Sequence, residues 1–159
     1  MTGRAASESA VDIAIVGGGM VGVSLALLLS HLKAGWRIRI IESFPLHSNA
    51  TLPPSFDGRS TALSHSSREI FELLGLWQSL HAGLTEIRQV HVSDRGHFGR
   101  TRLTATEQNL PALGYVVENR QLGDVLMAAL QRAPDVELTA PAQVAAVSPS
   151  SGGMQLQVS

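Results

Sequence analysis

The sequence contains no cysteine in its 159 residues. A disulfide framework, a thiolate metal site and a cysteine nucleophile are therefore excluded. Charged residues make up only 16 % of the chain and the formal net charge is −1, so we expect no basic surface of the kind that binds nucleic acid. The six histidines lack the spacing of metal ligands, and we expect no metal site.

Long apolar runs are also missing. A transmembrane helix needs roughly 18–20 apolar residues, whereas the longest candidate, residues 20–32, is interrupted by Gly22, Ser24 and Ser30. No small-residue cleavage site of a signal peptide follows the N-terminus. Aromatic residues are scarce at 4 %, yet 44 % of the chain is hydrophobic, which is enough for a folded core. We therefore expect a folded, cytoplasmic protein.

The N-terminal part of the chain has a β-α-β pattern. Residues 1–9 are small and polar, and we predict a disordered lead-in before a domain that occupies residues 10–159. Residues 11–16 are mostly apolar and β-branched, which predicts a strand buried on both faces of a parallel sheet. A helical pattern follows over residues 20–32, and residues 37–42 form a second strand. A helix between two strands of this kind joins them in parallel.

A glycine-rich turn joins the first strand to the helix. Gly17, Gly19 and Gly22 form the pattern G-x-G-x-x-G, and Glu42 ends the next strand. In a dinucleotide site the first glycine permits the tight turn, the second admits the pyrophosphate and the third lets helix and strand pack closely, while the acid accepts ribose hydroxyls. The alternative is a tight joint that binds nothing, with Glu42 solvated. The alignment of strand, turn, helix and acid favours a dinucleotide site.

The pattern after Glu42 departs from that of a plain NAD domain. A long polar loop over residues 43–54 precedes a predicted helix over residues 61–74. The rest of the predicted pattern consists of strands over 87–93, 99–104, 115–117, 143–147 and 154–158, with a helix around Leu122 and Leu126 before the last two. Turn signals between the strands indicate antiparallel hairpins. This order reads as an insertion between the halves of a nucleotide domain, and the end of the chain inside a predicted strand suggests truncation.

Several short motifs resemble one enzyme family. Residues 57–63 (DGRSTAL) resemble the D-x-R-x-x-A-L signature of the flavoprotein aromatic hydroxylases that act in ubiquinone biosynthesis. Residues 74–80, 90–97 and 114–119 fit the same family in order and spacing, and the second of these is typical of members that hydroxylate a polyprenylated methoxyphenol. The resemblance covers the chain from Val11 onward. It implies an α/β fold, a Rossmann-like FAD-binding domain of the glutathione-reductase type, with the start of an inserted β-rich substrate region.

The resemblance also implies a set of FAD contacts: Gly17, Gly19, Gly22, Glu42, Arg59, Asn119 and Val144. Arg59 would lie on the pyrophosphate or ribityl side of the cofactor, although a surface ion pair with Asp57 is the alternative. Asn119 stands where many wider relatives place an arginine, so its role stays open. Val144 would bring its backbone to the adenine, and its alternative role is a core residue.

The activity implied by the resemblance is hydroxylation of a polyprenylated phenol by FAD, with NAD(P)H as reductant and dioxygen as oxidant. No catalytic base can be assigned, because His91 and His97 read more simply as surface residues of a hairpin. The prenyl substrate implies a place at the inner membrane surface or in a ubiquinone-biosynthesis complex. Two alternatives stay open at this point, namely the nucleotide-binding half of an NAD-dependent dehydrogenase and a non-catalytic nucleotide-binding module.

Overall fold

A computed structural model describes residues 10–45, 54–94, 96 and 99–159. The predicted lead-in at residues 1–9 and most of the predicted loop over residues 43–54 lie outside this part of the chain.

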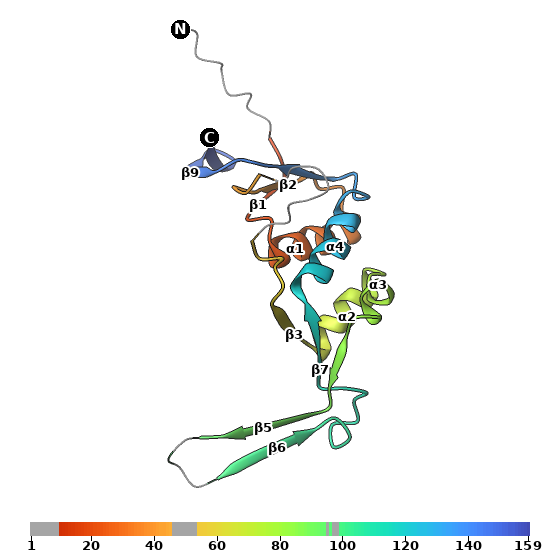
Figure 1. The fold of residues 1–159 in the computed structure, drawn as a ribbon. Coiled ribbons are helices and arrows are strands. Elements are labelled where there is room, and N and C mark those ends of the chain that lie inside the picture. The colour runs from red at the N-terminus through yellow and green to blue at the C-terminus, as the bar shows by residue number, and fades with distance from the viewer. Residues whose placement is uncertain (1–9, 46–53, 95, 97–98) are drawn as a thin grey trace.

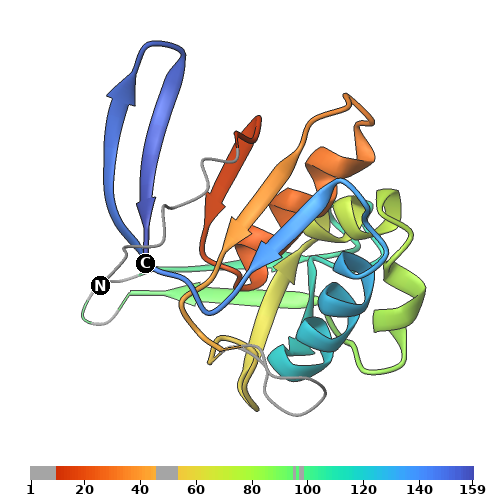
Figure 2. The same cartoon turned by 90° about the horizontal axis from the view of Figure 1, so that it is seen from above.

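A parallel three-stranded sheet forms one end of the molecule. Its strands, in the order β1-β2-β8, are β1 (Ile13–Val16), β2 (Ile38–Ile41) and β8 (Val136–Thr139). Helix α1 (Met20–His31) packs against the sheet, and α4 (Asn119–Leu130) lies alongside α1 (Figures 1 and 2). The predicted β-α-β unit is thus confirmed, with β1 and β2 parallel and in register from Ile13 opposite Ile38.

An antiparallel region occupies the middle and the far end of the molecule (Figure 1). Its central sheet has the order β3-β7-β4, formed by β3 (Ser60–Ser64), β7 (Gly114–Glu118) and β4 (Thr85–Ile87). Two helices follow β3 in the chain, α2 (His65–Leu73) and α3 (Trp77–His81). The remaining strands form two hairpins. The hairpin of β5 (Gln89–Ser93) and β6 (Arg100–Thr104) lies at the far end, and that of β9 (Val144–Ser150) and β10 (Gly153–Val158) lies at the end of the parallel sheet (Figure 1). Both hairpins were predicted, and both are confirmed.

The predicted helix over residues 61–74 was wrong at its start. Residues Ser60–Ser64 form strand β3, which pairs antiparallel with β7, and α2 begins only at His65. The cause is a strand partner more than 50 residues away in sequence, with Thr61 opposite Val117 and Leu63 opposite Tyr115. Tertiary pairing of this kind overrides local helical periodicity.

Strand β1 is not buried on both faces as predicted. Ile15 is 8 % exposed, but Ala14 is exposed and Val16 is 61 % exposed. Side chains alternate between the faces of a strand, and within the described residues α1 covers only one face of β1. The prediction also missed β8, the third strand of the parallel sheet, together with the short elements β4 and α3.

One continuous hydrophobic core connects the two regions. Val23 of α1, Ile40 of β2, Leu126 of α4 and Val117 of β7 are all fully buried in it. The helix α4 therefore ties the parallel sheet to the antiparallel region.

Candidate functional site

The glycine turn lies between the end of β1 and the start of α1. Gly17 adopts φ +107°, a conformation that strongly favours glycine, and its N–H donates to the carbonyl oxygen of Ile41 at 2.9 Å. A Cβ on Gly22 would overlap the carbonyl oxygen of Gly17. The turn is thus held against β2 on one side and against α1 on the other, as the G-x-G-x-x-G pattern requires.

Among the described residues, no side chain caps the N-terminus of α1. Gly19 is the N-cap residue, no side chain accepts a hydrogen bond there, and the first turn carries no acidic residue. The first N–H groups of a helix lack partners within the helix, and the helix dipole adds partial positive charge. This end of α1 is therefore suited to an anion such as a phosphate.

Glu42 is bound directly to the glycine turn. Its Oε2 accepts a hydrogen bond from the Gly18 N–H at 2.6 Å, and its Oε1 accepts from the Phe44 N–H at 2.7 Å and from Ser43 Oγ at 3.3 Å. The residue is only 9 % exposed. A carboxylate offers about four lone-pair positions, so these three contacts hold it in place and leave acceptor capacity for a hydroxyl group of a ligand.

A cavity of about 260 Å³ opens beside Glu42, at the carboxyl ends of the parallel strands. It is lined by Val16, Gly17, Ile41, Glu42, Ser43, Ala142, Gln143 and Val144. The Ala142 N–H donates to the Glu42 carbonyl oxygen at 2.8 Å, which holds the start of β9 beside the end of β2. Ligands of open parallel sheets bind at this edge, and the lining joins an acid to apolar walls that suit a ribose and an aromatic base.

Ser55 lies over the second glycine of the turn. If Gly19 carried a Cβ, that atom would lie 3.1 Å from Ser55 Oγ. Ser55 Oγ is buried and has no hydrogen-bond partner among the described residues. A Cβ on Gly19 would therefore lie in close contact with a hydroxyl that has no hydrogen-bond partner.

Arg59 and Asn119 belong to a separate cluster around Asp57. Asp57 Oδ1 accepts from the Arg59 N–H at 2.9 Å and from Asn119 Nδ2 at 3.3 Å, and its Oδ2 accepts from Arg59 Nε at 2.6 Å. Asn119 is 4 % exposed and its Oδ1 accepts from Thr61 Oγ1 at 2.6 Å. The Arg59 side chain is 77 % exposed. This cluster joins β3 to the N-terminus of α4.

The same contacts set the charge of Asp57. The Arg59 backbone N–H is the largest cause that lowers the pKa of Asp57 below its usual value. Desolvation opposes it and comes second, and the Arg59 guanidinium and the Asn119 amide lower the pKa further. Asp57 is therefore ionised at neutral pH and keeps the guanidinium of Arg59 beside it.

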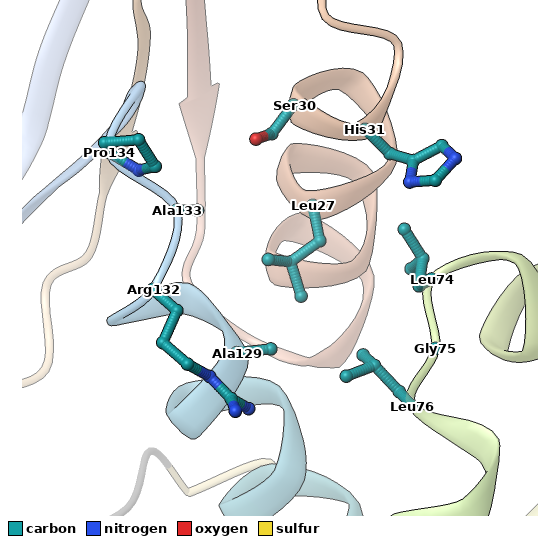
Figure 3. Close-up of a pocket in the computed structure, with 10 residues that line it drawn as sticks. All are labelled: Leu27, Ser30, His31, Leu74, Gly75, Leu76, Ala129, Arg132, Ala133 and Pro134. Carbon is teal, nitrogen blue, oxygen red and sulfur yellow. The ribbon is translucent and has the colours of Figure 1, made fainter.

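A larger cavity, of about 330 Å³, lies at the opposite end of α1 (Figure 3). Its walls come from the C-terminal ends of α1 and α4 and from the turn between α2 and α3, with Leu27, His31, Gly75, Leu76 and Arg132 among the lining residues. None of the predicted site residues lines it. Ser30 at its rim donates to Asp135 Oδ1 at 2.6 Å, a contact that ties α1 to the segment before β8, and the cavity is a gap between packed elements.

The structure therefore brings together only part of the predicted site. Gly17, Glu42 and Val144 line one cavity, with Gly19 and Gly22 in the adjoining turn, whereas Arg59 and Asn119 lie in the Asp57 cluster. Sequence reasoning missed Ser55 and the role of Gly18 as a donor to Glu42. The position of Ser55 two residues before the D-x-R motif was the only signal, and it becomes informative only once the chain is folded.

Two classes of feature are missing from the described residues. No helix there combines the length and the apolar character needed to cross a membrane. Within the same ranges, no three histidine or acidic side chains gather in a way that would hold a metal ion.

Comparison with known proteins places this geometry in context. A family model described as an FAD binding domain matches residues 10–158. Ubiquinone hydroxylase UbiL of Rhodospirillum rubrum is 31 % identical over 159 residues, which is 100 % of this chain and 35 % of the relative. The 3-demethoxyubiquinol 3-hydroxylase of Escherichia coli is 35 % identical over 137 residues, covering 86 % of this chain and 34 % of the relative. The chain thus spans about a third of the length of these curated relatives.

Solved structures share the fold at lower sequence identity. The flavin-dependent monooxygenase PieE, solved in complex with FAD and substrate, has a TM-score of 0.71 at 20 % identity, covering 96 % of this chain and 27 % of that protein. The anhydrotetracycline hydroxylase OxyS from Streptomyces rimosus has a TM-score of 0.72 at 18 % identity, covering 93 % and 28 %. These similarities show the fold, which is that of flavin-dependent monooxygenases.

Proposed function

Because this chain belongs to the FAD-binding domain family and is related to the flavin-dependent ubiquinone hydroxylases, we propose that it holds the adenosine-diphosphate half of FAD for a hydroxylase of that pathway. The matching family is described as an FAD binding domain, which supports a flavin rather than NAD as the resident cofactor of this site. The observation that carries the proposal is the Glu42 carboxylate, fixed by the Gly18 N–H inside the cavity at the strand ends.

The residues of the site fit this half of the cofactor. Glu42 would accept a ribose hydroxyl, and Gly17 and Val144 would lie beside the adenosine. The N-terminus of α1, which begins after Gly19, would receive the diphosphate. Glu42 also disfavours a 2′-phosphate, because two anions would repel each other.

Arg59 and Asn119 take a different part in the proposal. Asp57 would fix the position of the Arg59 guanidinium, which would then bind the diphosphate of FAD. An arginine side chain is always charged, and its planar group is well suited to a phosphate. Asn119 would act through its hydrogen bond to Asp57. Arg59 is engaged with Asp57, and neither residue lines the cavity beside Glu42.

The proposed substrate is a polyprenylated methoxyphenol. In the overall reaction the phenol, dioxygen, NAD(P)H and a proton give the hydroxylated phenol, water and NAD(P)⁺, so that one oxygen atom enters the ring and the other leaves as water. The bound flavin supplies the electron transfer and the oxygen chemistry. The described residues contribute by binding and orienting the adenosine and diphosphate end.

A prenylated substrate also suggests where the whole protein works. We propose that it acts at the inner membrane surface or within a ubiquinone-biosynthesis complex, because a long prenyl chain partitions into lipid. Sedimentation of the full-length protein with vesicles that contain the prenylated phenol, compared with vesicles without it, tests this. Equal recovery in the supernatant from both would contradict it.

The cofactor assignment is tested by replacing the acid. We expect Glu42→Ala in the full-length protein to weaken FAD binding by about 1.5–3 kcal/mol, the range of a hydrogen bond to a charged group. Titration of the apoprotein, followed by flavin fluorescence, measures this. Glu69→Ala on the exposed side of α2 is the matched control and should bind FAD normally. Unchanged affinity in Glu42→Ala, or preference of the wild-type protein for NAD⁺, would contradict the proposal.

The substrate assignment needs a separate measurement. We expect the full-length protein with FAD and NADPH to convert a prenylated methoxyphenol to a product heavier by one oxygen atom, detected by mass spectrometry. With ¹⁸O₂ the added oxygen should carry the label. NADPH oxidation without labelled product would count against hydroxylation of this substrate.

A further inference from the structure

Ser55 carries an unsatisfied hydroxyl at the glycine turn. Its Oγ is buried and lacks a hydrogen-bond partner among the described residues, although buried polar atoms nearly always have one. The hydroxyl lies 3.1 Å from the position that a Cβ on Gly19 would occupy. Burying a hydroxyl without a hydrogen bond costs free energy of folding. A ligand that accepts a hydrogen bond from Ser55 would remove this cost.

The neighbouring residues hold Ser55 in this position. Phe56, which is 3 % exposed, packs its ring against the backbone of α4, and a Cβ on Gly123 would come within 2.5 Å of the ring. Asp57 is fixed in turn by the Arg59 N–H and by Asn119. Ser55 is therefore set by a buried ring and a hydrogen-bonded turn that follow it directly in the chain.

The surroundings of the Ser55 hydroxyl favour an anion. It faces the start of a 12-residue helix whose N-cap is Gly19, with no capping side chain and no acid in the first turn. The Glu42 carboxylate is already engaged with the N–H groups of Gly18 and Phe44. A hydroxyl donor next to the N–H groups of the first turn of a helix matches the oxygen atoms of a phosphate.

We propose that Ser55 is a cofactor-binding residue whose hydroxyl donates a hydrogen bond to a diphosphate oxygen of FAD. This inference rests on the proposed function. It gives a role to a residue outside the glycine motif. It also connects the D-x-R segment to the glycine turn, because the hydrogen bonds that hold Asp57 in place also restrain Ser55, two residues earlier.

Binding experiments on the full-length apoprotein separate this role from others. We expect Ser55→Ala to bind FAD and ADP about tenfold more weakly, the size of a hydrogen bond to a charged group. Binding of adenosine, which has no phosphate, should be unchanged. Glu42→Ala should weaken the binding of FAD, ADP and adenosine, because the proposed contact of Glu42 is with the ribose that all three contain. Ser66→Ala, on the exposed surface of α2, is the matched control.

Thermal unfolding of the apoprotein gives a second readout. Removing an unsatisfied buried hydroxyl should leave the Tm unchanged or raise it, whereas the stabilisation by ADP should shrink. A lowered Tm of the apoprotein, equal loss for ADP and adenosine, or unchanged ADP affinity would each overturn the role of Ser55. Failure of the wild-type protein to bind FAD would instead overturn the proposed function itself.

Discussion

Gly22 faces the carbonyl oxygen of Gly17 so closely that a Cβ would overlap it. At the scale of single residues, the glycine motif is thus explained by two different constraints. Gly17 needs its positive φ, and Gly22 needs the absence of a side chain. Glu42 adds a third, because its carboxylate closes the turn through the Gly18 N–H.

The variant Gly22→Ala tests the packing constraint. Alanine has a higher helix propensity than glycine by about 1 kcal/mol, but a clash with backbone costs about 1–3 kcal/mol or more and backbone cannot easily move. We expect a net loss of stability, seen as a lower Tm, and loss of bound flavin. Gly152→Ala, at a turn with open space around its Cα, is the control. A Tm of Gly22→Ala at or above wild type would show that the turn is looser than described.

The Asp57 carboxyl offers a test of pH dependence. Its pKa is lowered chiefly by the Arg59 backbone N–H, so the contacts of Asp57 are present above the pKa of an unfolded aspartate, about 3.9, and are lost as the pH falls through the lower folded pKa. We expect the pKa of Asp57 in Arg59→Ala to stay below its ordinary value, because the N–H remains. NMR titration of the Asp57 carboxyl carbon measures this, with Arg120→Ala as control. Return of the pKa to its ordinary value in Arg59→Ala would assign the shift to the guanidinium.

At the scale of elements, the junction of β3 and α2 shows how a strand is converted to a helix within one residue. Ser64 is the last residue of β3 and also the N-cap of α2, where its Oγ accepts from the Ser67 N–H at 3.1 Å. Pairing with β7 holds the first half of the segment extended. The cap then satisfies a helix N–H that would otherwise lack a partner.

Loss of this cap should weaken the junction. We expect Ser64→Ala to cost about 1 kcal/mol, which lowers the Tm by about 2–4 °C for a domain of this size. Ser64→Asp should restore most of it, since aspartate is also a strong N-cap. Thermal unfolding followed by circular dichroism at 222 nm measures the change, and Ser66→Ala serves as the control. Equal Tm values for Ser64→Ala and Ser66→Ala would rule out a stabilising cap.

At the scale of the whole molecule, binding and chemistry are assigned to different parts. The described site residues are proposed to bind a ribose and a diphosphate, and the chain spans about a third of the length of the hydroxylases it matches. Val16 on β1 and Val21 on α1, at 61 % and 82 % exposed, leave apolar surface next to the glycine turn open.

We expect these 159 residues alone to form no hydroxylated phenol, even with FAD, NADPH and a prenylated phenol supplied. Oxygen chemistry on a flavin needs a site from which water is excluded, and the described residues that we assign to the cofactor are proposed to hold its adenosine and diphosphate end. Product detection by mass spectrometry, with the full-length protein in parallel, measures this. Turnover by the 159-residue chain at a rate near that of the full-length protein would refute the assignment of cofactor binding and chemistry to different parts of the protein.

The sequence by itself determined the local features of this protein. The β-α-β unit, the glycine turn with Glu42 and the two hairpins follow from periodicity and turn residues between close neighbours in the chain. These signals are local, because a tight turn or a helix face depends on residues a few positions apart.

Only the tertiary structure decided the features that depend on distant partners. Residues Ser60–Ser64 became a strand because β7 lies beside them, and β8 joined the parallel sheet about 100 residues after β2. Ser55 reached the glycine turn because Phe56 is buried against Gly123 of α4. Contacts of this kind arise when the core closes, and neither the hydrophobic period nor the turn residues of a segment record which distant segment will face it.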